Sequence, residues 1–113
     1  RNEMVYMLCL DSKCKIIDCR HLGEGSVNSA GVPLRRIVDV ALKTNAVSVV
    51  LAHNHPGGLA CPSSDDIQTT ARVAQALANV DVVLVDHLIF ADDDFVSMLQ
   101  SGHFNRSEFT VWR

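Results

Sequence analysis

Three residues that can bind a metal lie within fourteen positions of the chain. His53 and His55 follow an apolar run, and Asp66 comes after a loop rich in proline and glycine. Residues two apart in a strand point to the same face, so both imidazoles can be directed at one point. Histidine nitrogens and carboxylate oxygens are ordinary zinc ligands, and three protein ligands with one open position are typical of a catalytic zinc. The pattern predicts a zinc site formed by His53, His55 and Asp66.

The same residues also have purely structural interpretations. A histidine at a strand end is often a surface or hydrogen-bonded residue. Ser63 and Asp66 have the spacing of a helix capping box, and an acid in the first turn complements the helix dipole. A carboxylate cannot easily cap a helix and bind a metal with the same lone pairs. From the residues alone, both interpretations stay open.

The spacing of these residues resembles that of a known motif. JAMM (MPN-plus, JAB-type) zinc metallopeptidases carry H-x-H, seven residues, then S-x-x-D, and His53, His55, Ser63 and Asp66 match this without a gap. The resemblance extends over about residues 3–102. Neighbouring residues resemble the bacterial RadC-like branch, long labelled "DNA repair protein RadC"; they are Asn54, Pro56, Gly58, Pro62, Ile67 and the run Asp86-His87-Leu88-Ile89.

The resemblance implies a cofactor, Zn2+, and a mechanism. Glu3 matches the glutamate that this family places before its first strand, and it would take a proton from the attacking water and deliver it to the leaving amine. The Ser63 hydroxyl would donate a hydrogen bond to the water or to the oxyanion. Glu24, a second candidate acid in a glycine-rich turn, does not match the motif. These roles describe a metallohydrolase that cleaves peptide or isopeptide bonds.

A second function stays open beside the enzyme. The metal could stabilise a non-catalytic accessory or interaction domain in DNA repair or mobile-element biology. Glu3 distinguishes the two, because a scaffold needs no acid beside the metal. The pair Asp86-His87 interrupts an apolar segment and would be costly to bury unpaired. It either orients a metal ligand or forms a structural hydrogen-bonded pair.

Hydrophobic periodicity and turn residues predict strands alternating with two helices. Pro33 suits the first turn of the first helix, Asn45 its end, and Ser63 the start of the second helix, which runs to about Asn79. The order predicts a mixed sheet flanked by helices, an α/β three-layer α-β-α sandwich, which the resemblance specifies as the JAB/MPN (cytidine-deaminase-like) type. The expected strands are 4–10, buried on both faces, 15–22, 46–52, 82–85, 88–91 and 95–97.

The composition limits the remaining possibilities. The 113 residues are 48% hydrophobic, and with a net charge of -3 they predict one globular domain that binds nucleic acid weakly or not at all. We expect residues 1–113 to be the C-terminal domain of a longer bacterial protein, with 103–113 as a tail. Four cysteines without a C-x-x-C pair favour reduced thiols and a cytoplasmic location, with a disulfide as the lesser alternative. No apolar stretch suggests a membrane. The expected partners are an unidentified peptide or protein substrate and DNA-repair proteins; a homodimer is a further alternative.

Overall fold

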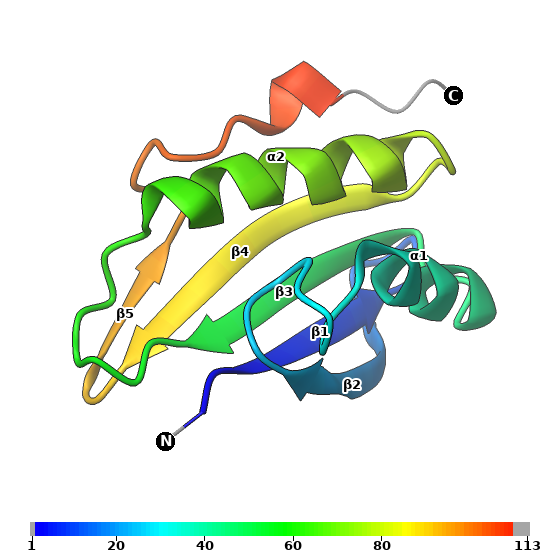
Figure 1. The fold of residues 1–113 in the computed structure, drawn as a ribbon. Helices are drawn as coiled ribbons and strands as arrows, with labels where there is room; N and C mark the ends of the chain where they lie inside the picture. Colours follow the sequence, from blue (N-terminus) through cyan, green and yellow to red (C-terminus); the bar gives the residue numbers. More distant parts are fainter. Residues whose placement is uncertain (1, 110–113) are drawn as a thin grey trace.

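The computed structural model describes residues 2–109, which form a five-stranded sheet with two α-helices (Figure 1). Residue 1 and residues 110–113, the end of the expected tail, lie outside the described part. The elements are β1 (Met4–Leu10), β2 (Ile16–Glu24), α1 (Leu34–Lys43), β3 (Ser48–Asn54), α2 (Ser64–Ala78), β4 (Val83–Ala91), β5 (Asp94–Ser97) and a short 3-10 helix, η1 (Arg106–Phe109).

The strand order places both helices on one face of the sheet. The order is β2-β1-β3-β4-β5, with β1 antiparallel to β2 and β3, and β3 parallel to β4. The chain therefore crosses the sheet twice in the same direction, from β2 to β3 through α1 and from β3 to β4 through α2. Because such crossovers are almost always right-handed, both helices belong on the same face. Ile37 of α1 and Leu77 of α2 accordingly share one buried cluster.

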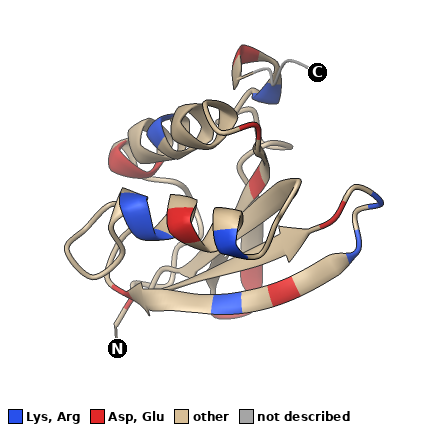
Figure 2. Ribbon diagram, turned by 90° about the vertical axis from the view of Figure 1, so that its right-hand side faces the viewer, with Lys and Arg blue, Asp and Glu red and all other residues tan. Residues whose placement is uncertain are grey.

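The predicted α/β class with a mixed sheet is confirmed, whereas the layering requires a correction. Within residues 2–109, α1 and α2 form one layer on one side of the sheet (Figure 2), and no helix of this part covers the other side, so two layers stand where three were expected. The uncovered side carries an apolar groove of about 720 Å³, whose lining includes Met4, Tyr6, Leu8, Ala52 and Phe90.

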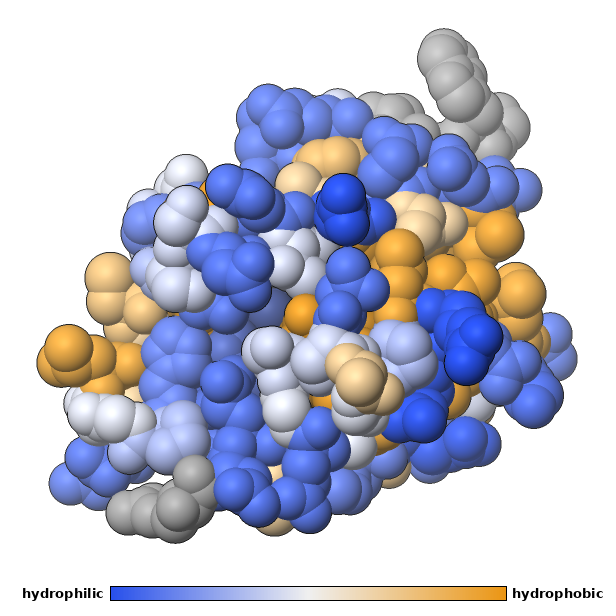
Figure 3. Space-filling model, in the orientation of Figure 1, coloured by the Kyte–Doolittle hydropathy of each residue, from blue (hydrophilic) through white to orange (hydrophobic). Residues whose placement is uncertain are grey.

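Strand β1 shows the consequence of this one-sided packing. Val5, Met7 and Cys9 are fully buried, while Tyr6 is 41% exposed. The expectation that residues 4–10 are buried on both faces is therefore wrong. The physical reason is that alternate residues of β1 face the uncovered side of the sheet, where no helix packs. In the view of Figure 3, hydrophilic side chains cover most of the surface, and a further apolar patch lies where α1 is drawn.

The helices begin and end close to their predicted limits. Pro33 precedes the first turn of α1, and Asn45, just past its end, has a positive φ of 56°. Ser63 caps α2: its hydroxyl accepts from the Asp66 N–H, and the Asp66 carboxylate accepts from the Ser63 N–H, which makes a capping box. This cap fixes the first turn of α2 and, with it, the position of Asp66.

Strand β4 differs from the prediction. Residues 83–91 form one strand, where two strands interrupted at Asp86 and His87 were expected. The strand continues because both polar side chains find partners: the Asp86 carboxylate accepts from the Ser97 hydroxyl and the Leu99 N–H, and His87 is hydrogen-bonded among buried residues. The β3–β4 pairing shifts its register between Val49, which pairs with Leu84, and Val50, which pairs with Asp86.

The described part of the C-terminal segment packs on the domain. Phe104 is 7% exposed and belongs to the core cluster, and its ring stacks with that of Phe109 at 5.9 Å. The four cysteines are free thiols, and Cys9 is the buried one. Among residues 2–109, no helix combines the length and the apolar character needed to cross a membrane.

Candidate metal centre

The end of β3 directs His53 toward the helical side of the sheet. The strand continues to Asn54, two residues beyond the predicted end, and His53 is 2% exposed. His55 follows the strand and is held by its N–H, which donates to the Phe90 carbonyl of β4 at 2.7 Å. Gly58, with a positive φ of 86°, then supplies a turn that few other residues adopt and sends the loop toward α2.

Hydrogen bonds leave the Nε2 atom of each imidazole directed into the site. The Leu59 carbonyl lies 2.9 Å from His55 Nδ1, and since a carbonyl only accepts, Nδ1 donates this hydrogen bond, while His55 Nε2 faces Asp66 Oδ2 at 3.1 Å. His53 Nε2 is buried and has no hydrogen-bond partner among the described residues. A buried polar atom without a partner is rare and calls for an explanation. The ring centroids lie 4.8 Å apart, so one ion can be reached by both.

Asp66 lies beside both imidazoles. Its Oδ1 is 3.5 Å from His53 Nε2, and its Oδ2 is 3.1 Å from His55 Nε2. Oδ2 also accepts the Ser63 N–H of the capping box at 2.8 Å. Oδ2 therefore takes part in both the cap and the site, whereas Oδ1 faces His53 without a role in the cap, so capping leaves one carboxylate oxygen available for a metal. Burial raises the pKa of Asp66, but the hydrogen bond from Ser63 and the nearby His53 bring it below its ordinary value.

Glu3 completes the cluster from the start of β1. Its Oε1 is 3.8 Å from His53 Nε2, and candidate ligand atoms of Glu3, His53 and His55 all lie within 4.8 Å of one another. The β1–β3 register explains this, because Val5 pairs with His53, and Glu3 lies two residues before Val5 on the same face. Burial raises the pKa of the Glu3 carboxyl, His55 opposes the shift and Asp66 adds to it.

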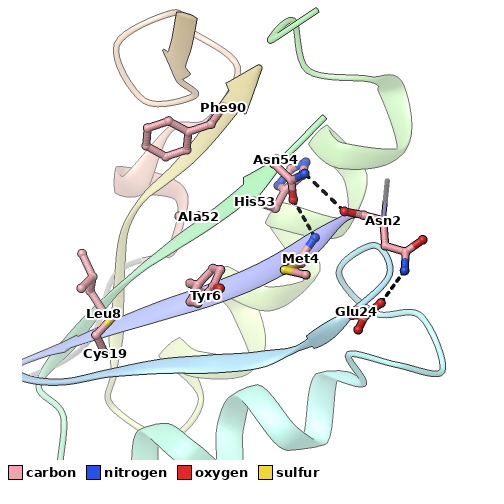
Figure 4. Close-up of a pocket in the computed structure, with 10 residues that line it drawn as sticks. All are labelled: Asn2, Met4, Tyr6, Leu8, Cys19, Glu24, Ala52, His53, Asn54 and Phe90. Carbon is pink, nitrogen blue, oxygen red and sulfur yellow. Dashed lines mark hydrogen bonds between the residues drawn. The ribbon is translucent and has the colours of Figure 1, made fainter. Parts of the chain in front are cut away.

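Asn54 anchors the backbone on either side of Glu3. Because successive strand residues point to opposite faces, its side chain lies on the face opposite to His53, where its Oδ1 accepts the Met4 N–H at 2.7 Å and its Nδ2 donates to the Asn2 carbonyl at 3.3 Å (Figure 4). The role of Asn54 was missed, because the sequence does not reveal that β1 pairs with β3. Glu24 instead accepts a hydrogen bond from Asn2, and it is not part of the cluster.

Two buried residues stand behind His53. His53 Nδ1 is 2.7 Å from His87 Nε2, and His87 Nδ1 is 2.7 Å from the Thr70 hydroxyl. Burial lowers the pKa of His53 to about 4 and that of His87 to about 3, so both rings are neutral at pH 7. The role of Thr70 was missed, although Thr70 follows Asp66 by four residues on α2, a spacing that places both residues on the same face of the helix.

The arrangement fits a metal such as zinc. The structure brings together His53, His55, Asp66 and Glu3, and the orphaned Nε2 of His53 faces the carboxylates of the last two. Two imidazoles with carboxylates are a usual zinc donor set. Either carboxylate can be the third ligand by position. Ser63 is observed as a helix cap, and its catalytic role stays a prediction.

Comparison with known proteins identifies the family of this chain. The family model described as "RadC-like JAB domain" matches residues 1–103. UPF0758 proteins are similar at 43% identity over 102 residues in Photobacterium profundum, 46% over 101 residues in Bordetella parapertussis and 44% over 100 residues in Aeromonas hydrophila. These alignments cover 88–90% of this chain and 45–46% of the relatives, so the chain spans about half of their length. The chain belongs to the RadC-like JAB domain family.

Proposed function

We propose that this domain is a zinc-dependent metallohydrolase that cleaves peptide or isopeptide bonds. The observation that supports this most directly is the buried, unpartnered Nε2 of His53, which faces two carboxylates and lies beside a second imidazole. A structural core histidine would have satisfied this nitrogen with a hydrogen bond. JAB domains of the JAMM type are metallopeptidases, and the cluster supplies the residue types that such chemistry needs.

The residues divide into ligands and proton carriers. His53, His55 and Asp66 would hold the ion, since their atoms face one another across 3.1–3.5 Å. Zinc, when bound, would polarise the scissile carbonyl and lower the pKa of water. The Glu3 side chain is about one-third exposed, and its carboxylate lies slightly farther from His53 than that of Asp66 does. Glu3 can therefore reach both a water molecule beside the ion and a substrate. Its raised pKa suits a group that takes up a proton and then gives it to the leaving amine.

Ser63 contributes a donor at the same site. Its oxygen accepts the Asp66 N–H at 3.0 Å, which leaves the hydroxyl proton free to donate toward a developing oxyanion. The helix cap would thus place a catalytic group as well as Asp66. This role rests on the resemblance and on the position of Ser63 at the start of α2.

Substitution of the two carboxylates tests the proposal. Asp66→Asn should abolish stoichiometric zinc binding, whereas Glu3→Gln should retain zinc and lower peptide-bond cleavage by about 10²–10⁴-fold, the usual contribution of a general acid–base group. Zinc content would be measured by elemental analysis and cleavage with a peptide library. Loss of zinc in Glu3→Gln would make Glu3 a ligand. Wild-type protein that binds zinc but cleaves no peptide or isopeptide bond would favour the accessory domain.

The remaining expectations extend this proposal. Basic residues are interspersed with acidic residues along α1 and β2 (Figure 2), which supports weak nucleic-acid binding at most. A cytoplasmic location is in keeping with free thiols, of which three are exposed. An association with DNA-repair proteins and the formation of a homodimer stay predictions.

A further inference from the structure

A chain of hydrogen bonds runs from the metal centre into the core and back. It starts at His53 of β3, passes through His87 of β4 and Thr70 of α2, and ends at the backbone carbonyl of Asp66. Each of its three links is 2.7 Å long. Because Asp66 also faces His53 across the site, the chain closes a ring through three elements of the fold.

The direction of each hydrogen bond follows from the Thr70 hydroxyl, which has one proton. The Asp66 carbonyl can only accept, so at 2.7 Å this proton belongs to the bond with Asp66. Thr70 Oγ1 must then accept from His87, which places the proton of the neutral His87 ring on Nδ1. Met98 Sδ, at 3.5 Å, is a weak acceptor and does not alter this, since giving it the proton would still leave Oγ1 to accept from His87.

The same reasoning extends to His53. With its proton on Nδ1, His87 presents a lone pair on Nε2, and His53 Nδ1 lies 2.7 Å from it. His53 must therefore carry its proton on Nδ1, which leaves Nε2 bare. The other groups that face His53 are Glu3, Asp66 and His55. The two carboxylates would by themselves draw a proton to Nε2, so the chain of hydrogen bonds acts against them.

We propose that Thr70 and His87 are positioning residues which fix the tautomer of His53, so that its Nε2 lone pair is directed at the metal before the metal arrives. This inference rests on the metal centre proposed above and adds to it the residues that prepare one ligand. Partners of this kind, which hold the second nitrogen of a metal-binding histidine, typically change metal affinity by about 10–100-fold. On His55, Nδ1 donates directly to the Leu59 carbonyl, and Nε2 lies 3.1 Å from Asp66 Oδ2.

A set of threonine variants separates the tautomer from general effects on folding. Thr70→Val keeps the shape of the side chain and removes the hydroxyl, so His87 loses the acceptor that fixes its proton on Nδ1. Thr70→Ser restores the hydroxyl. Thr69→Val is the matched control, because Thr69 is the adjacent buried threonine of the same helix and is not part of the chain of hydrogen bonds.

Two measurements are made on each variant. Zinc affinity is measured by competition with a chromophoric chelator. Ring proton–nitrogen NMR correlations of the metal-free protein show which nitrogen of His53 carries the proton, with the His53→Asn spectrum for assignment. We expect the Nδ1–H form in wild type, Thr70→Ser and Thr69→Val. In Thr70→Val we expect Nε2 protonation to appear and zinc affinity to fall at least tenfold, with the other two variants within twofold of wild type.

The outcomes distinguish this inference from the metal centre itself. A wild-type His53 protonated on Nε2 would overturn the inference, as would a Thr70→Val protein that binds zinc as tightly as Thr69→Val. Wild-type protein that binds no zinc would overturn the proposed metallohydrolase and, with it, the role of the chain in metal binding. In that case the NMR spectrum would still show whether the tautomer is fixed as described.

Discussion

Single side chains in this site act through backbone positions as much as through their own chemistry. Asn54 shows this, because it lies between two candidate ligands and yet points to the other face of the sheet. One amide group accepts from the residue after Glu3 and donates to the residue before it. A second anchor is the Gly25 N–H, which donates to the Glu3 carbonyl at 2.9 Å. The position of the Glu3 carboxylate therefore depends on a residue that touches no metal.

Asn54→Ala should lower hydrolysis while zinc stays bound. Without the amide, the segment before β1 gains freedom, and a shift of about 1 Å in a reacting group can lower the rate by about 10²-fold. The rate would be compared with that of Glu3→Gln, and zinc content would be determined on the same samples. Asn79→Ala is the control, because Asn79 lies at the C-terminal end of α2, whereas the site lies at the start of that helix. An Asn54→Ala enzyme with the wild-type rate would show that the amide does not position Glu3.

At the scale of elements, the start of α2 combines a structural role with a proposed catalytic one. Ser63→Ala should lower the free energy of unfolding by about 1 kcal/mol, whereas Ser63→Gly should lower it by only a few tenths, because glycine is a tolerable N-cap. Both changes remove the hydroxyl. If it stabilises the oxyanion, we expect both variants to lose activity equally, by about 10²-fold. Activity that follows the denaturant-measured stability instead would restrict Ser63 to capping.

Local signals in the sequence were sufficient for the helices and for half of the site. The capping box and the proline before α1 are local, so both helices were predicted within one or two residues. Strand β4 was not, because Asp86 and His87 look like an interruption until their partners are known. Those partners lie in β3, in α2, at the end of β5 and just after it, which no local pattern indicates. The spacing of His53, His55 and Asp66 was visible, while the link through Asn54 depended on strand pairing and the link through Thr70 on the packing of α2 against β4.

At the scale of the whole molecule, the one-sided layering concentrates the ionisable groups of the site on the covered face. Glu3, His53 and His87 come from three neighbouring strands or their ends, and the β1–β3–β4 register aligns them beneath the start of α2. The opposite face stays apolar and open. Because the imidazoles of His53 and His87 are both buried on the covered face, the stability of the fold depends on pH.

The metal-free protein should lose stability as the pH falls below about 6.5. Burial lowers the pKa of His53 to about 4 and that of His87 to about 3, whereas in the unfolded chain both are near 6.5. Between these values the unfolded chain binds protons that the folded chain does not, so acid favours unfolding. Each proton contributes at most about 1.36 kcal/mol per pH unit, so two protons give at most about 2.7 kcal/mol per pH unit. The raised pKa of Glu3 has the opposite effect on the pH dependence of stability, but it is one group, whereas two histidines act in the other direction.

Urea unfolding between pH 7.5 and 5 in the presence of a chelator measures this slope. His103→Asn removes an exposed histidine and should leave the slope unchanged. His87→Leu removes one of the two buried imidazoles, so the slope should fall to about half, while the overall stability also falls because His53 Nδ1–H loses its buried acceptor. A free energy of unfolding that stays constant across this range would mean that both rings accept protons in the folded state. The closed arrangement of His53, His87 and Thr70 would then not persist in solution.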